Sequence, residues 1–376
     1  MKITRIETFV VEANVASWVF LRLHTDDGLV GLGDCTLESK EHTVLGALQD
    51  VTPLVLGRDP RQIERLWQEL YRRSPWQGVG LFTAMSGLEQ AMWDITGKAY
   101  GQPVYRLLGG ECRERLRLYT WPQPAGDSPA GYAEGALEAV SRGYTALKTD
   151  PFGELFFTAT PGQIETTVGK VAAMREAVGP DVAIAVDGHQ RFYPQAAIAI
   201  AHALEPLGVL FFEEPVPSDN LDALAKVSQG MRGLRVPLAT GERHFTRWQF
   251  RPLLERQLVD VIQPDVCHVG GLWELRKIAA MAEPYDVPVA PHNPNGPVGM
   301  AAAAQVGFCT PNFLALESTH SRAWQWELVD PPYEIVDGHL RRPERPGLGF
   351  ELNEAAVRRR AGTPRPMDFW RHVVVE

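Results

Sequence analysis

Short apolar runs in the second two-thirds of the chain each lead into an ionisable residue. The runs are TALK (145–148), VAIAVD (182–187), VLFFEE (209–214), VPLATGE (236–242), VDVIQPD (259–265), VPVAPH (287–292) and FLALE (313–317), and the residues at or next to their ends are Lys148, Asp187, Glu213, Glu242, Asp265, His292 and Glu317. An ionisable side chain buried without a partner costs on the order of several kcal/mol. The repeat therefore indicates groups gathered to bind a cation and do chemistry.

Three carboxylates follow successive runs, at Asp187, Glu213 and Glu242. Carboxylate oxygens are hard ligands that suit Mg²⁺, whereas zinc is less expected because no cysteine or closely paired histidine accompanies them. A salt bridge at a strand end explains any one of these acids, but it does not easily explain three in register. Glu214 directly follows Glu213, and strand alternation allows only one of the two to face inward. Spacing alone leaves that choice open.

Two histidines accompany the carboxylates. Asp265 and His292 close consecutive runs, and a carboxylate beside an imidazole fixes its tautomer and makes it a serviceable base near neutral pH. Alternatively, His292 caps the PNPNGP loop that follows it. His189 lies two residues beyond Asp187 and is a candidate second acid or base on the other side of the metal. The alternative for His189 is a loop histidine bonded to the backbone.

These residues need a framework that brings strand ends together. Apolar runs alternate with helix-length amphipathic segments from residue 116 onward, which indicates a parallel sheet with right-handed crossovers. At least seven such units, with a further strand at 116–120, fit a closed β/α barrel better than an open sheet. In such barrels the carboxyl ends of the strands meet at one mouth, where the active site lies.

The first 115 residues follow a different pattern. Strands are predicted at 3–11, 18–25 and 29–34, with TDDG (25–28) as a hairpin turn, and helices are predicted at 40–52, 60–73 and 81–100. We therefore expect an α+β capping domain over 1–115, a barrel over 116–328, and a C-terminal segment over 329–376. This last segment contains the turn-like PGLG (346–349) and is predicted to pack back on the capping domain.

The bulk properties narrow the possible partners and the location. The net charge of −9 and the pI near 5.6 argue against a nucleic-acid surface. The basic run Arg358–Arg360 is interpreted as a solvated helix end. No apolar stretch approaches the roughly 20 residues of a membrane helix, and the N-terminus lacks an apolar signal core. The cysteines lack metal-type spacing and are expected to be free thiols, so we predict a cytoplasmic protein.

Longer motifs make the chain resemble the enolase superfamily, in its mandelate racemase subgroup and galactonate dehydratase branch. They are WDITGKAYGQPVYRLLGG (93–110), VDGHQRF (186–192), FFEEPV (211–216), PLATGERHF (237–245), IQPDVCHVGG (262–271), APHNPNGPVG (290–299) and PGLGFEL (346–352). The resemblance implies a (β/α)7β barrel, a modified TIM barrel, capped by an α+β domain. It also implies a homo-oligomer, either a dimer or an octamer.

The resemblance also implies roles for individual residues. Asp187, Glu213 and Glu242 become the Mg²⁺ ligands, and His292 with Asp265 becomes the base dyad. Glu317 becomes the partner of the substrate carboxylate or enolate oxygen, and His189 the general acid. Many members of the subgroup carry Lys-x-Lys at the second barrel strand, but here the segment reads Lys148-Thr149-Asp150. The insertion at 151–162 and the cap loop at 11–18 are not assigned to a substrate pattern.

The function that follows is a Mg²⁺-dependent sugar acid dehydratase, a hydro-lyase of carbohydrate catabolism. His292 is expected to remove the C2 proton, and His189 to protonate the departing 3-hydroxyl, giving a 2-keto-3-deoxy acid. Lys148 is expected to hold the substrate or a metal ligand, or to be structural. Asp150, Trp18 and Glu317 are candidate substrate-binding residues, and the candidate lid positions are Asn14, Ser17, Trp18, Trp76 and Gln77.

Three other functions compete with dehydration. An epimerase or cycloisomerase would use the same proton abstraction without losing water, although the altered Lys-x-Lys disfavours bases on both faces. A catalytically silent regulatory homologue should carry a broken ligand set or dyad, and the sequence shows neither. An unrelated metal-dependent barrel, such as an aldolase, would leave the paired Asp265 and His292 unexplained.

Overall fold

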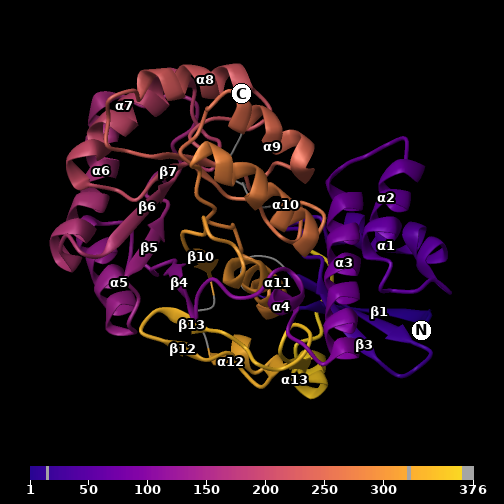
Figure 1. Cartoon of the computed structure of the whole chain (residues 1–376). Helices are drawn as coiled ribbons and strands as arrows, with labels where there is room; N and C mark the ends of the chain where they lie inside the picture. The colour runs from indigo at the N-terminus through magenta and orange to yellow at the C-terminus, as the bar shows by residue number, and fades with distance from the viewer. Residues whose placement is uncertain (14–16, 320–322, 366–376) are drawn as a thin grey trace.

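The computed structural model of the chain describes residues 1–13, 17–319 and 323–365. Figure 1 shows an antiparallel sheet with its helices beside a ring of parallel strands and outer helices. The C-terminal segment, drawn in yellow, runs between the ring and the N-terminal sheet. None of the described helices is long and apolar enough to cross a membrane.

The N-terminal sheet is a three-stranded meander. Strands β1 (Ile3–Val11), β2 (Trp18–Thr25) and β3 (Val30–Asp34) pair antiparallel in chain order, and helices α1 (Glu41–Val55), α2 (Ile63–Arg73) and α3 (Val79–Tyr100) follow. Gly28, with φ of 89°, supplies the left-handed turn of the hairpin, where glycine has no steric cost. Helix α3 ends at Gly101 in the left-handed conformation, as expected from the sequence.

The barrel closes through paired strands and single bridges. Strands β4 (Arg115–Thr120), β5 (Ala146–Thr149), β6 (Ala183–Asp187), β7 (Phe212–Glu213), β8 (Leu238–Thr240) and β9 (Val261–Ile262) pair in parallel in that order. Ile262 then bridges Val289, Val289 bridges Phe313, and β10 (Leu316–Ser318) pairs in parallel with β4. The ring of eight positions confirms the predicted (β/α)7β arrangement.

The run VPVAPH, predicted as a full strand, forms only single bridges at Val289. Pro288 and Pro291 flank this residue, and proline has no N–H to donate to a sheet. Val289 still donates to Asn312 O at 2.8 Å and accepts from Leu314 N at 2.8 Å. The segment therefore keeps its place in the ring with few ladder bonds.

Seven helices cover the outside of the ring. They are α5 (Pro129–Ser141), α6 (Pro161–Val178), α7 (Pro194–Leu204), α8 (Leu221–Gly230), α9 (Thr246–Glu255), α10 (Leu272–Ala282) and α11 (Pro297–Phe308), with short helical turns η1 (Glu205–Leu207) and η2 (Glu283–Tyr285) after α7 and α10. Helix α11 is buried along its whole length, because it also packs against β3 and against the four-residue helix α4 (Val104–Leu107). The barrel and the N-terminal unit thus share part of their packing.

The barrel interior below the mouth is filled by small residues and two aromatic rings. One side chain per strand contributes to this layer, namely Tyr119, Ala146, Ala185, Phe211, Ala239, Val261, Ala290 and Ala315. The Tyr119 and Phe211 rings meet edge to face with centroids 6.0 Å apart. Since alternate residues of a strand face the same side, the residue two positions further along also faces the axis, at the mouth.

The C-terminal segment connects both parts of the molecule. It contains the short elements α12 (Ala323–Trp326), β11 (Val329–Asp330), β12 (Ile335–Val336), β13 (His339–Arg341), β14 (Glu351–Leu352) and α13 (Glu354–Arg359). Strand β13 pairs antiparallel with β4, so it extends the barrel sheet. Further on, Leu348 N donates to Asp94 Oδ1 of α3 at 2.8 Å, and Gly362 N donates to Val10 O of β1 at 2.8 Å.

Candidate active site

Three carboxylates converge at the mouth of the barrel. Asp187 and Glu213 stand opposite each other at the ends of β6 and β7, and Glu242 follows β8 by two residues. All three are buried, and one oxygen of each lies within 4.8 Å of the others. Among the described residues, none donates a hydrogen bond to Glu213 Oε2. A buried, unsatisfied oxygen in a set of three hard ligands fits a divalent cation of the Mg²⁺ type.

Strand alternation decides between Glu213 and Glu214. Glu213 faces the axis because it lies two residues after Phe211 of the interior layer. Glu214 adopts a positive φ of 38° and turns away toward Arg243, which binds its Oε2, and toward Gln190, which donates to the same oxygen at 3.2 Å. Burial raises the pKa of Glu214 to about 7, although Arg243 acts in the opposite direction.

Lys148, at the mouth end of β5, lies inside the acidic cluster. Its Nζ is 2.9 Å from Asp187 Oδ2, 2.6 Å from Glu213 Oε1 and 3.2 Å from Glu317 Oε1, and its side chain is 1% exposed. Burial on its own lowers the pKa of Lys148, but the carboxylates of Asp187, Glu213 and Glu317 raise it well above its usual value. In this structure Lys148 is therefore the ammonium counter-charge of the cluster.

His292 approaches the carboxylates from the side of Glu242. Its Nδ1 is 2.8 Å from Asp265 Oδ2, and its Nε2 is 3.4 Å from Glu242 Oε2. Asp265 is itself held by the backbone N–H of Cys267 at 2.7 Å and by the Asn295 amide at 3.1 and 2.9 Å. Burial lowers the pKa of His292, but the negative charge of Glu242 and the bond to Asp265 raise it well above normal. The bond to Asp265 therefore fixes the orientation of the imidazole, with Nε2 toward the triad.

His189 approaches from the side of Asp187. Its Nε2 lies 3.3 Å from Asp187 Oδ2, and its Nδ1 lies 2.8 Å from Asp150 Oδ2. The Trp121 ring is stacked on the imidazole, with centroids 5.9 Å apart and planes at 19°. Burial opposes a charge on His189, yet the carboxylates of Asp187 and Asp150 raise its pKa. The two histidines therefore contact different members of the carboxylate triad.

Glu317, at the end of β10, is held by two N–H donors. Trp121 Nε1 donates to its Oε1 at 2.6 Å, and the backbone N–H of Asn293 donates to its Oε2 at 2.9 Å. Together with the ammonium of Lys148, these donors fix a buried carboxylate at the mouth.

Three residues at the site were not predicted from the sequence. Trp121 follows β4 and lies two residues after Tyr119 of the interior layer, so alternation could have found it. Arg243 binds Glu242 Oε1 at 2.6 Å. In the sequence it directly follows Glu242, and only Glu242 was considered as a site residue. Glu38 comes from the capping domain: burial raises its pKa, while the charges of His292 and other basic groups act against that rise. No sequence signal pointed to Glu38.

The lid candidates have varied surroundings. Trp18 is buried, with its ring 5.6 Å from that of Trp324 and 6.1 Å from that of Phe20. The backbone N–H of Ser17 donates a hydrogen bond to Glu41 Oε1 at 3.1 Å. Their role as a lid stays a prediction.

The other lid candidates lie apart from these contacts. Trp76 is 87% exposed, and Gln77 donates to Tyr71 O at 3.3 Å. Asn14 lies outside the described residues.

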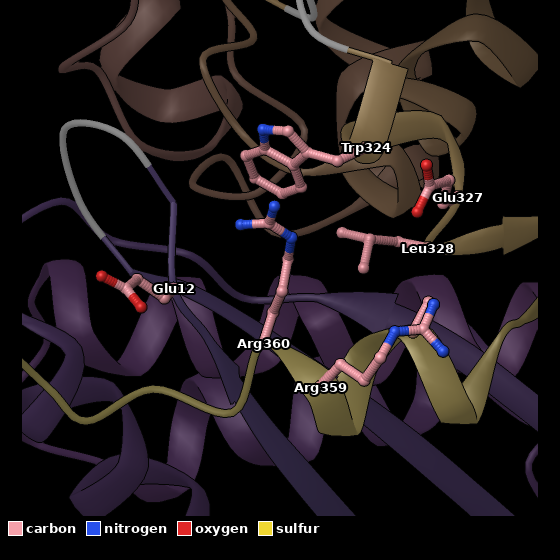
Figure 2. A pocket seen from close by; sticks show the side chains of 7 residues that line it. Glu12, Trp324, Glu327, Leu328, Arg359 and Arg360 are labelled. Carbon is pink, nitrogen blue, oxygen red and sulfur yellow. The ribbon is translucent and has the colours of Figure 1, made fainter.

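A separate cavity lies next to Trp324, away from the carboxylate triad. It measures about 370 Å³ and is lined by Glu12, Trp324, Glu327, Leu328, Ala356, Arg359 and Arg360. Figure 2 shows the Arg360 guanidinium against the Trp324 ring, 3.7 Å from the centroid. None of the residues predicted to do chemistry lines this cavity.

Comparison with known proteins agrees with the architecture. Residues 4–109 match the family described as mandelate racemase / muconate lactonizing enzyme, N-terminal domain, and residues 131–356 match the enolase C-terminal domain-like family. The D-galactonate dehydratase of Variovorax paradoxus strain S110 is 37% identical, over 99% of this chain and 98% of that protein. The D-galactonate dehydratase of Ralstonia nicotianae strain GMI1000 is 36% identical over the same shares.

Solved structures give the same result. A member of the enolase superfamily from Salmonella Typhimurium superimposes with a TM-score of 0.88 at 33% identity, covering 95% of this chain and 97% of that one. A mandelate racemase/muconate lactonizing enzyme from Jannaschia sp. CCS1 gives a TM-score of 0.90 at 32% identity, covering 97% and 99%. The resemblance noted in the sequence is confirmed, and the chain belongs to the enolase superfamily.

Proposed function

We propose that this enzyme is a Mg²⁺-dependent acid-sugar dehydratase that converts an aldonate into a 2-keto-3-deoxy acid. The observation that carries the proposal is the presence of two histidines, His189 and His292, each bonded to its own carboxylate and each in contact with the acidic triad. Relatives that are named D-galactonate dehydratases match essentially the full chain, which supports elimination of water as the outcome.

The metal would be held by Asp187, Glu213 and Glu242. Enzymes of this superfamily use a divalent metal, and hard oxygen ligands favour Mg²⁺ among the candidates. When bound, Mg²⁺ supplies Lewis-acid stabilisation of negative charge on the substrate carboxylate, which contributes several kcal/mol in such sites.

His292 is proposed to remove the proton at C2 of the substrate. Asp265 holds Nδ1–H at 2.8 Å, so the lone pair of Nε2 is directed toward the mouth. The electron pair of the broken C–H bond moves onto the carboxyl group to give an enediolate. We assign Glu317 and Lys148, whose charged groups are 3.2 Å apart, to the carboxyl end of the substrate, where the Lys148 ammonium would offset negative charge. A positioned base of this kind contributes about 10²- to 10⁴-fold.

His189 is proposed to complete the elimination as the general acid. Its proton passes to the 3-hydroxyl as the C3–O bond breaks, so water leaves and the enediolate electrons form the C2=C3 double bond. The enol then takes a proton at C3 and becomes the 2-keto acid. Over the whole sequence one water is lost and no oxidant or reductant is needed.

The test is a panel of aldonates with Mg²⁺, beginning with D-galactonate and its epimers, followed by semicarbazide detection of 2-keto acid. His292→Asn should bind metal but lose exchange of the C2 proton with deuterated water. His189→Asn should keep that exchange while losing keto-acid formation. Exchange without keto acid in the wild-type enzyme would instead indicate an epimerase or cycloisomerase. Absence of exchange on every member of a broad panel would favour a silent homologue.

A cytoplasmic location and a homo-oligomeric state, as a dimer or octamer, are also part of this proposal. Light scattering coupled to gel filtration tests the assembly directly.

A further inference from the structure

Asp150 lies just beyond β5, two residues after Lys148, and both of its oxygens are engaged by the protein. Its Oδ2 is 2.8 Å from His189 Nδ1 and also binds the guanidinium of Arg191. Its Oδ1 accepts the backbone N–H of Phe152 at 3.1 Å. Asp150 was predicted to be a substrate ligand, but a carboxylate occupied in this way is better suited to orienting its neighbours.

Arg191 connects Asp150 to the insertion at 151–162, a segment for which the sequence predicted no role. The Arg191 side chain is 2% exposed, and its second guanidinium nitrogen donates to Gly153 O at 2.9 Å. The backbone of the insertion is bonded to the same loop, since Phe157 N donates to Arg191 O at 2.8 Å and Tyr193 N donates to Phe157 O at 2.8 Å. The insertion therefore braces the loop that carries His189.

The loop itself needs that support. His189 and Gln190 have φ values of 44° and 61°, in the left-handed region that residues with a Cβ rarely adopt. Such a conformation is strained and persists only where surrounding contacts impose it. The bonds from His189 N to Asp187 Oδ1 at 2.8 Å and from Gln190 N to Glu214 O at 2.7 Å contribute to holding it.

We propose that Asp150 and Arg191 are positioning residues for His189, and that they determine which nitrogen of its protonated imidazole delivers a proton and in which direction. Asp150 accepts Nδ1–H, so Nε2 is the nitrogen turned to the triad, 3.3 Å from Asp187 Oδ2. Arg191 fixes the position of the Asp150 carboxylate. The inference rests on the proposed dehydration and assigns these residues to its acid half alone.

A plain salt bridge between Asp150 and Arg191 that only closes the loop is the competing explanation. The two explanations differ in what an isosteric change does to each half of the reaction. A positioning role predicts that Asp150→Asn slows water loss about 10- to 10²-fold, a part of the 10²- to 10⁴-fold that a placed proton donor contributes. It also predicts that C2 exchange, which depends on His292, stays within about twofold of wild type.

The experiment measures keto-acid formation and C2 exchange side by side, on the first aldonate of the panel that the wild-type enzyme dehydrates. Variants are Asp150→Asn, Arg191→Lys and, as the matched control, Asp127→Asn. Asp127 is also paired with a cation, Lys170 at 2.6 Å, but it is 79% exposed. Arg191→Lys keeps the charge but lacks the two separate guanidinium nitrogens that bind Asp150 and Gly153. Both site variants should slow elimination selectively, and the control should change neither rate.

A second readout needs no turnover. Histidine ¹⁵N spectra of the metal-free protein, with His189 assigned by its loss in His189→Asn, should show Nδ1 protonated in wild type and a changed signal in Asp150→Asn. Equal loss of exchange and elimination in Asp150→Asn, or an unchanged His189 signal, overturns the inference. If no aldonate yields keto acid, the proposed function fails, and the spectra alone decide the positioning role.

Discussion

Lys148→Met removes a buried positive charge while keeping much of the volume of the side chain. The ammonium lies 2.6 to 3.2 Å from oxygens of Asp187, Glu213 and Glu317. Without metal, the variant leaves these buried carboxylates short of a counter-charge. We therefore expect the metal-free variant to be less stable than the metal-free wild type at neutral pH.

The size of the loss follows from the contacts. At an effective dielectric constant near 20, one ion pair at 2.9 Å has a gross attraction of about 6 kcal/mol, most of which is offset by desolvation. Removing one partner of a buried ion pair typically costs about 3 to 5 kcal/mol. With an unfolding entropy of about 2.1 cal/mol/K per residue, this corresponds to a Tm lower by about 5 °C for a chain of 376 residues.

Two conditions should reduce that loss. Added Mg²⁺ supplies two positive charges to the same carboxylates, and it no longer competes with an ammonium, so it should stabilise the variant more than the wild type. Lower pH should act in the same direction. Burial and the charge of Asp187 raise the folded-state pKa of Glu213 well above its unfolded value, so its destabilising contribution is absent below the unfolded pKa and grows as the pH rises.

The assay is thermal unfolding of wild type and variant in EDTA and in MgCl₂, at pH 5.5 and 8. Lys170→Met is the matched control, because Lys170 has a side chain 7% exposed but pairs with Asp127, which is 79% exposed. It should lose about 1 kcal/mol or less, with no change in the response to Mg²⁺. If metal-free Lys148→Met is as stable as wild type, or gains no more from Mg²⁺, then Lys148 is not the counter-charge of the metal ligands.

Three further changes test other contacts. Gly347→Ala should lower the Tm, because Gly347 has a φ of 70° and a Cβ there would overlap the Asp94 carboxylate; calorimetry measures it. Glu89→Gln should cost about 1 to 3 kcal/mol in chemical denaturation, because Glu89 accepts N–H bonds on both oxygens, including two at the start of α10, and an amide offers only one acceptor. Trp121→Phe keeps the stacked ring but loses the 2.6 Å bond to the buried Glu317 carboxylate, so kcat should fall about tenfold and stability should fall by about 1 to 3 kcal/mol; an unchanged kcat would contradict that role.

Most of the barrel could be predicted because apolar runs alternate with helix-length segments and each run leads into an ionisable residue. The small interior residue Ala185 precedes Asp187 by two positions, and Phe211 precedes Glu213 by two positions. On these strands, the residue two positions after an interior residue therefore faces the mouth of the barrel. The alternation also distinguishes Glu213 from Glu214, but only when the layer below is known, and spacing in the sequence did not reveal that layer.

Other features depended on contacts that the local sequence does not encode. The charge of Glu38 interacts with those of His292 and Glu242 across the packing between the N-terminal unit and the barrel, which the local sequence does not encode. The sequence alone does not distinguish Arg243 from an exposed loop residue, because its contact depends on Glu214 pointing away from the barrel axis. The VPVAPH run was predicted as a strand because apolar content was weighed above the missing N–H groups of its prolines.

The link between Asp150 and His189 follows the same rule that predicted the base dyad. Asp265 and His292 were paired because they follow consecutive positions of the ring, and the contact is present at 2.8 Å. Strands β5 and β6 are also neighbours, with Thr149 opposite Val186, so side chains just beyond their ends must meet. Asp150 was judged instead by the lysine it replaces. Since each histidine is held by a carboxylate from the preceding barrel strand, one geometric arrangement orients both imidazoles, and they differ in which triad oxygen they face.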